Sequence, residues 1–397
     1  MRYYRAPRRV NMNSSDQSPY RFDIASKPHD AEWDEFLEAT PDSNHLQSSL
    51  WSQLKSKVGW RVLRLIARSD KTIVGGFQIL HRRLPITGSV GYIPRGPVVA
   101  RDDTALCKLI LEKLDSIART ERLTYLAIQP PRRSAQFVPE LLQHGFRPSA
   151  FELAPTATVL IDVNKSQAEM LAAMRKSRRR VIQKGLRGPI TVRTGTERDL
   201  PAFHSLLVST GRRHRFFPQA IEHFRTIWDL FSRSNKIVLF IAECSGEPVA
   251  GELDIAFGDT LVAKRAGWSG RHASDHPVEL LVWAAINWAK QQGLKYYDME
   301  GIDSDLARAL IKGKPISRSF EQSHHVSKLG FGGEIILLPE NIERVYPAIL
   351  GQAHRNLWLR AAKLRLVRTI ARQAFLRIVS GLQRYGVAGR PTASPPN

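Results

Sequence analysis

The chain has 397 residues, of which 43% are hydrophobic and 24% charged, a composition typical of globular rather than disordered proteins. This length favours two domains over a single core. Lysine and arginine number 59 against 37 acidic residues, and the net charge of +22 predicts attraction to polyanions: RNA, diphosphate-bearing ligands or an anionic membrane surface. Two distant cysteines, Cys107 and Cys244, exclude a disulfide framework and a four-ligand zinc site, which fits a reducing cytosol.

The first 20 residues are polar and basic, and they predict a disordered arm. They lack the apolar stretch of a secretory signal. No run in the chain approaches the roughly 18 apolar residues that a membrane-spanning helix needs. We therefore expect a protein that can touch a membrane without crossing it.

Two segments far apart in the sequence repeat one order of predicted elements. Each begins with a β-branched run, a polar turn and a second strand, a hairpin pattern, over 64–76 and again over 239–251. A strand, a helix and another strand follow, at 90–93, 104–122 and 123–126 in the first copy and at 261–266, 277–292 and 294–297 in the second. Each copy closes on a Gly-Phe pair, Gly145-Phe146 and Gly330-Phe331. This order predicts two similar mixed α/β lobes.

A basic helix is predicted between the two copies. It starts at the capping box Ser166-Gln167-Ala168-Glu169 and ends at Gly185. One face carries six cations and is a candidate RNA contact, with a solvated basic face as the alternative: Arg175, Lys176, Arg178, Arg179, Arg180 and Lys184. The predicted units are an arm over 1–20, lobes over 21–160 and 191–345, this linker over 161–190, and a tail over 346–397.

The tail is basic and amphipathic. Residues 351–397 carry nine arginines and lysines and no acidic residue, with leucine, isoleucine and phenylalanine interleaved. This pattern predicts helices that bind an anionic membrane surface through 351–390, in preference to RNA.

Several motifs, in order and spacing, resemble those of the Fem family of peptidoglycan aminoacyltransferases over residues 20 to 345. They are Gln47-Ser48-Ser49-Leu50-Trp51 with Lys55, Tyr92-Ile93-Pro94-Arg95-Gly96-Pro97, Ser209-Thr210-Gly211-Arg212-Arg213, Tyr297-Asp298 with Gly301, and Lys328-Leu329-Gly330-Phe331-Gly332-Gly333. The resemblance implies a mixed α/β (α+β) fold of two tandem acetyltransferase-like (GNAT) lobes. It also implies transfer of an aminoacyl group from aminoacyl-tRNA to an amine of a nucleotide- or lipid-linked muramoyl-peptide precursor, with no cofactor.

The resemblance implies roles for particular residues. Lys55 and Arg213 would hold the precursor's phosphates, and Lys328 would lie near the transfer centre, where an ammonium can stabilise an oxyanion. Asp298 is a candidate catalytic carboxylate, with helix capping as the alternative. The other candidates for substrate binding are Trp51, Tyr92, Arg95 and Arg212, for which packing, turn formation or solvation are the alternatives. The glycines beside Lys328 would let the backbone approach a ligand closely, and the linker cations become candidate tRNA contacts.

The chain departs from the family before Gly267, where Lys264, Arg265 and Ala266 stand in place of aromatic residues. Because of this difference, the family's precursor pocket and its acceptor do not carry over directly to this chain. Adjacent His324 and His325 lack a carboxylate partner at helical spacing, so we expect no metal.

Two other functions stay open. One is a GNAT-type N-acyltransferase that uses acyl-CoA on a polysaccharide or nucleotide-sugar precursor. The Gln/Arg-x-x-Gly-x-Gly/Ala loop of CoA users occurs at 383–388, outside both lobes, which disfavours this reading. The other is a non-catalytic RNA- or membrane-binding protein, which leaves the repeated lobes unexplained. We expect a bacterial protein in the cytoplasm, free or peripheral on the inner face of the plasma membrane.

Overall fold

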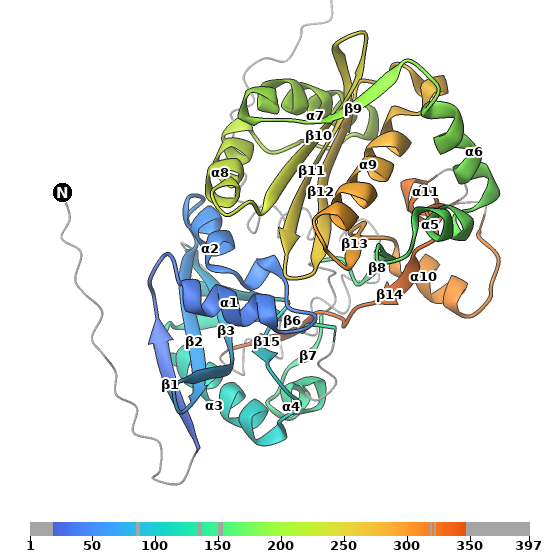
Figure 1. Cartoon of the computed structure of the whole chain (residues 1–397). Coiled ribbons are helices and arrows are strands. Elements are labelled where there is room, and N and C mark those ends of the chain that lie inside the picture. Colours follow the sequence, from blue (N-terminus) through green and yellow to red (C-terminus); the bar gives the residue numbers. More distant parts are fainter. Residues whose placement is uncertain are drawn as a thin grey trace, which may run out of the picture.

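The computed structural model describes residues 19–84, 88–132, 137–149, 154–317, 320 and 323–346, which form two lobes (Figure 1). The predicted arm lies outside these residues except at its end, and the tail lies outside except for residue 346. The predicted disorder and membrane binding of those segments therefore stay predictions. Among the described residues, no helix combines the length and apolarity that a membrane crossing requires.

The first lobe is built on a sheet of strand order β1-β2-β3-β4-β6-β15-β7. Its strands are β1 (Tyr20–Ala25), β2 (Arg61–Ser69), β3 (Thr72–Leu84), β4 (Gly88–Pro94), β6 (Leu123–Gln129), β15 (Ile342–Val345) and β7 (Arg147–Pro148), with β5 (Val98–Val99) paired to β3. Its helices are α1 (Ala31–Ala39) and α2 (Ser49–Ser56) between β1 and β2, then α3 (Thr104–Thr120) and α4 (Phe137–Gln143). Asp103 caps α3, and the apolar stripe of this helix, with Ile110 and Leu114 fully buried, packs in the core of this lobe.

The second lobe has a sheet of order β14-β8-β13-β12-β11-β10-β9. Its strands are β14 (Glu334–Leu337), β8 (Ala157–Asp162), β13 (Tyr296–Asp298), β12 (Thr260–Trp268), β11 (Glu247–Phe257), β10 (Ile237–Cys244) and β9 (Ile190–Thr194). Its helices are α7 (Leu200–His214) and α8 (Ile221–Ser232) between β9 and β10, then α9 (Pro277–Gln291), α10 (Ser304–Ile311) and α11 (His324–Leu329).

The repeat predicted from the sequence is confirmed. Both hairpins form, as β2–β3 and β10–β11, and each is followed by a third antiparallel strand, a helix and a strand parallel to the third. The helices are α3 and α9, and α9 starts at Pro277 and ends before Gly293, which has φ +73°. Each copy also carries two helices before its hairpin.

The repeats exchange their last strands. After β7, β8 leaves the first lobe and pairs with β13 and β14. After β14, β15 returns to pair with β6 and β7 of the first lobe (Figure 1). The boundaries 21–160 and 191–345 remain our proposal for the repeats in sequence, although in space each sheet takes one strand from the other repeat.

A third apolar cluster joins the lobes. Leu50, Trp51 and Leu54 of α2 pack with buried residues of α7, α8, β10 and β11, including Phe203 and Phe231. Helix α2 is therefore part of the first lobe by connection and of the second lobe's core by packing.

The prediction of a single linker helix over the basic segment is wrong. The segment forms α5 (Gln167–Ala173), which starts at the predicted capping box, and α6 (Lys176–Gly185), with Met174 and Arg175 extended between them. A distant part of the chain stabilises this break, because the Arg175 N–H donates to the Gly330 carbonyl at 3.0 Å. Gly332 lies so close that a Cβ there would sit 2.5 Å from the Ala173 carbonyl.

Candidate functional site

The two parallel central strands separate in the second lobe. Strands β12 and β13 pair only over 260–262 with 296–298, after which β12 continues to Trp268 while the other chain turns away. In the first lobe the equivalent strands, β4 and β6, stay paired from Ser89 to Pro94. The split between β12 and the chain after β13 therefore has no counterpart in the first lobe.

Lys328 of α11 holds one side of the split. Its ammonium donates to the carbonyls of Met299 at 2.7 Å, Gly301 at 2.8 Å, and Glu300. Burial lowers the pKa of Lys328, and the carboxylates of Glu300, Asp298 and Glu252 partly oppose this shift. The ammonium thus fixes the backbone at the point where the strands part.

An ion pair crosses the split. Lys264 of β12 donates to the Glu300 carboxylate at 2.5 Å. Burial alone would raise the pKa of Glu300, but Lys264, Arg265 and Lys328 together hold it below its usual value. Glu300 has φ +41°, so its carboxylate is presented from an unusual backbone conformation.

Two further carboxylates lie buried on β11. Glu252 is 3% exposed and accepts from the Tyr297 hydroxyl at 2.6 Å, while its Oε2 has no hydrogen-bond partner among the described residues. Burial raises the pKa of Glu252 to about 7. Burial and the neighbouring Glu252 charge raise the pKa of Asp254 well above its usual value. At neutral pH these groups can carry protons that ordinary carboxylates would have lost.

The first lobe contributes α2. Two ammonium groups lie near the Trp51 ring, with the Nζ of Lys55 4.9 Å and that of Lys264 5.6 Å from its centroid. Burial lowers the pKa of Lys55 to about 8, and the charges of Lys264 and Arg265 contribute to this shift. Burial and the same three cations lower the pKa of His223 on α8 to about 3, so that ring is neutral. Positive charge is therefore concentrated around Trp51.

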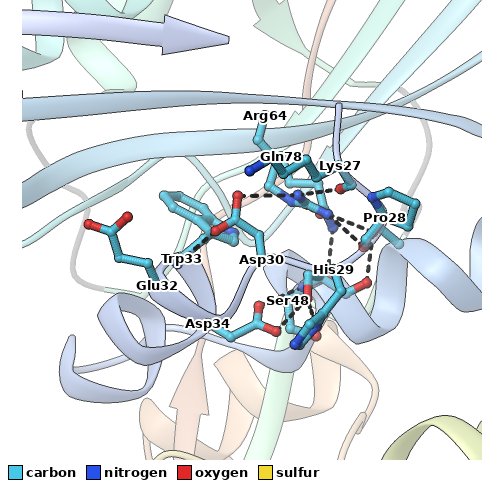
Figure 2. Close-up of polar contacts among 12 residues, drawn as sticks. Lys27, Pro28, His29, Asp30, Glu32, Trp33, Asp34, Ser48, Arg64 and Gln78 are labelled. Atoms are coloured by element: carbon cyan, nitrogen blue, oxygen red, sulfur yellow. Dashed lines mark hydrogen bonds and ion pairs between the residues drawn. The ribbon is translucent and has the colours of Figure 1, made fainter. Parts of the chain in front are cut away.

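A buried arginine fixes the position of α2 (Figure 2). Arg64 of β2 is fully buried and donates to the Gln78 amide oxygen at 2.8 Å, the Lys27 carbonyl at 2.8 Å and the Ser52 hydroxyl of α2 at 3.0 Å. Its ion pair with Asp30 spans 3.5 Å. Such a buried cation requires these acceptors together, so the network fixes the relative positions of β2, α1 and α2.

The serines and glutamine before Trp51 serve the same purpose. Asp34 of α1 accepts from the N–H and hydroxyl of Ser49 at 2.6 and 2.5 Å. Gln47 accepts from the Gln78 N–H at 2.6 Å and donates to the Pro94 carbonyl at 2.6 Å. The motif that carried the resemblance therefore positions α2 and ties it to the turn that bears Arg95.

Arg95 reaches from the first lobe towards the second. Its Nη2 donates to the Pro155 carbonyl at 3.2 Å, and its buried Nη1 has no partner among the described residues. Burial lowers the pKa of Arg95, and Asp298, Tyr92 and Glu300 oppose that shift. Tyr92 is buried in β4, which raises its pKa to about 12. A cavity of about 660 Å³ lies between the lobes, lined among others by Asp42, His45, Arg95, Arg132, Thr158 and Asp298.

Asp298 has a structural task. Its carboxylate accepts from the Thr158 hydroxyl at 2.5 Å and from the Glu300 N–H at 2.8 Å. Burial raises its pKa. The helix-capping alternative is wrong, because Asp303 caps the following helix α10; the contacts of Asp298 instead shape the turn that Lys328 also holds.

Arg213 and Arg212 lie apart from this cluster. Arg213, near the end of α7, donates to the Trp268 carbonyl and lies over the Trp268 ring at 4.9 Å. Trp268 ends β12, about 10 Å along the strand from Arg265. Arg212 is exposed. Arg213 therefore belongs to the rim of the split rather than to its interior.

The predicted RNA contacts divide into two groups. Arg178 pairs with Glu279 at 2.5 Å and donates to Ser327 at 2.9 Å, next to Lys328. Arg179 and Lys184 donate to carbonyls of the protein at 3.5 and 3.4 Å. The remaining members are exposed: Arg175, Lys176 and Arg180.

The glycines after Lys328 contact protein rather than open space. A Cβ at Gly332 would meet Ala173, and one at Gly333 would lie 2.6 Å from Val159. The expectation that these glycines allow approach to a ligand is therefore wrong, since they let the turn pack into the α5–α6 break and against β8.

Sequence reasoning noted Lys264 and Arg265 only as departures from the family and missed Glu300, Glu252 and Asp254. For Glu252 and Asp254, a charged residue inside an otherwise apolar strand was the available signal. Among the described residues, no group of three or more His, Cys, Asp or Glu side chains could hold a metal ion.

Comparisons with known proteins place this geometry in a class. The model of the acetyltransferase (GNAT) domain matches residues 172–307, and the FemAB family model matches residues 29–141. The crystal structure of FemX superposes with a TM-score of 0.73 at 18% identity, covering 81% of this chain and 97% of that one. The fold is thus that of a protein with two tandem GNAT-like lobes.

Two curated relatives show which kind of transferase the chain is similar to. A lipid II:glycine glycyltransferase of Staphylococcus saprophyticus is 25% identical over 244 residues, covering 59% of this chain and 58% of that protein. One from Staphylococcus aureus is 24% identical over 288 residues, covering 70% of this chain and 67% of that protein. The chain is thus similar to the FemAB family over residues 29–141 and to the GNAT domain over residues 172–307. It aligns with less than two thirds of the first relative's length.

Proposed function

We propose that the chain is an acyltransferase that moves an aminoacyl group from a charged tRNA to an amine on the peptide of a lipid-linked muramoyl precursor, at the cytoplasmic face of the membrane. The cation cluster at the split carries this proposal. Lys55 and Lys264, with Arg265 close by, gather around Trp51, and Lys264 is paired with Glu300. Three cations this close together, one of them buried, suit a diphosphate. The relatives' names point to the same precursor class.

The reaction requires positioning more than activation, because an aminoacyl ester is already reactive. The acceptor nitrogen attacks the ester carbonyl, the bond from that carbon to the ribose oxygen breaks, and an amide forms. The proton lost by the amine ends on the ribose oxygen. We assign Lys328 to the carbonyl oxygen: its ammonium would exchange one of its three backbone acceptors for this oxygen and stabilise the negative charge of the intermediate. Asp298 positions the turn that holds Lys328.

The donor assignment rests on the strand-to-helix turns. CoA pyrophosphates bind the free N–H groups at a helix N-terminus. In α9, Pro277 has no N–H and the first-turn carboxylate of Glu279 is paired with Arg178. In α3, the N-terminus is capped by Asp103. Neither turn suits a pyrophosphate, whereas the exposed cations of α6 suit a tRNA backbone.

The second candidate is transfer from acyl-CoA. The match of residues 172–307 to the GNAT domain favours it. Transfer from acyl-CoA is nevertheless less favoured than aminoacyl transfer, because the N-termini of α3 and α9 do not suit a pyrophosphate.

The donor is tested by offering the purified chain a mixture of charged tRNAs or a panel of acyl-CoAs, with lipid-linked muramoyl pentapeptide as acceptor. We expect a mass gain of one amino-acid residue that requires tRNA and disappears after ribonuclease treatment of the donor. A gain seen with acyl-CoA alone would replace the first proposal with the second.

A further inference from the structure

The loop between α7 and α8 presents two aromatic rings to solvent. Phe216 is 43% exposed and Phe217 is 87% exposed. Exposed apolar side chains are common singly, but here two consecutive phenylalanines are exposed together at the tip of one short loop. Nothing in the interlobe site uses them.

The exposure does not come from a loose loop. The Phe216 N–H donates to the Gly211 carbonyl at 2.9 Å, and a Cβ at Gly211 would lie 2.5 Å from the Phe216 carbonyl oxygen. His204 bonds the Gln219 carbonyl at 3.0 Å through its ring nitrogen. The backbone on both sides of the tip is thus anchored to α7, and the rings are held outward.

The surroundings of the tip are strongly basic. The last turn of α7 and its cap present four exposed residues that are cationic or can become so: Arg212, Arg213, His214 and Arg215. The segment from Leu200 to Ile221 contains no aspartate or glutamate. Apolar rings rimmed by cations match the hydrocarbon and phosphate layers of an anionic lipid surface.

We propose that the α7–α8 loop docks on an anionic membrane, with Phe216 and Phe217 below the headgroups and the neighbouring arginines at the lipid phosphates. A protruding tip suits lipid better than RNA, because base-stacking aromatics line grooves that follow the backbone of a strand. The surface also adjoins Arg213 at the rim of the split. If the proposed function holds, docking here would bring a lipid-linked diphosphate to that rim.

The test uses the full chain and vesicles of phosphatidylcholine with or without phosphatidylglycerol, without donor or precursor. Its outcome is therefore independent of the proposed reaction. Phe216→Ser with Phe217→Ser should weaken binding to the anionic vesicles about tenfold. The control is Leu186→Ser with Ile311→Ser, which removes two apolar side chains that are 63% and 54% exposed beside other cations. This control variant should bind the anionic vesicles as tightly as the unmodified chain does.

A reporter locates the contact. In a Cys244→Ser background, an environment-sensitive fluorophore on Phe217→Cys should shift to the blue when anionic vesicles are added. Three results would overturn the proposal: no vesicle binding by the unmodified chain, equal binding by the two double variants, or no spectral shift at position 217. Loss of tRNA binding by the phenylalanine variant with unchanged vesicle binding would reassign the loop to RNA.

Discussion

Lys328 offers a prediction at the scale of a single residue, because the chain contains a matched control. Its ammonium donates to the carbonyls of Met299, Glu300 and Gly301, and that of Lys290 donates to those of Val163, Asn164 and Lys165. Lys328→Met should lower kcat roughly 100-fold through loss of oxyanion stabilisation.

Lys290→Met removes the same kind of contact away from the site and should leave kcat near that of the unmodified chain. Steady-state kinetics with thermal unfolding of both variants separates chemistry from stability. Equal losses of kcat in the two variants would show that Lys328 only supports the fold.

Lys55 gives a pH prediction. Because its pKa is lowered to about 8, the side chain loses its charge as the pH rises through that value. If it binds phosphate, kcat/KM for the precursor should fall above about pH 8, since this quantity follows the free enzyme. An arginine stays charged in that range, so Lys55→Arg should move the decline to higher pH. A decline at the same pH in both proteins would remove Lys55 from phosphate binding.

At the scale of elements, Gly332 ties the turn before β14 to the break between α5 and α6. It has φ +80°, and an added Cβ would lie 2.5 Å from backbone atoms of Ala173. Gly332→Ala should destabilise the protein by about 2 kcal/mol or more, from clash and positive φ together. Gly313→Ala shares the positive φ, at +71°, but has nothing within 4 Å, so it should cost about 1 kcal/mol. Urea unfolding compares them, and equal losses would contradict the packing role.

This glycine also shows where sequence reasoning stopped. The hairpins, α3 and α9 were predictable because their periodicity, caps and turns are local. The break between α5 and α6 depends on Gly330 and Gly332, more than 150 residues away in sequence, so the capping box alone suggested one continuous helix. The same holds for the site, since Lys264 and Glu300 become partners only when β12 and β13 are placed together.

At the scale of the whole molecule, the exchanged strands β8 and β15 and the insertion of α2 into the second lobe's core link the two lobes. Neither sheet is complete without the other repeat. We therefore expect one cooperative thermal transition, with equal calorimetric and van't Hoff enthalpies. Leu54→Ala, in the core shared between the lobes, should lower the free energy of unfolding by about 2–4 kcal/mol while the transition stays single. Two separate transitions would show that the lobes fold independently.

The most direct test of the central claim is aminoacyl transfer at the split between β12 and β13. Charged tRNA and lipid-linked muramoyl pentapeptide are mixed with the unmodified chain, the Lys328→Met variant or the Lys290→Met variant, and the precursor is weighed by mass spectrometry. We predict a gain of one amino-acid residue with the unmodified chain and Lys290→Met, and little with Lys328→Met. No gain with the unmodified chain, or an undiminished gain with Lys328→Met, would contradict the account.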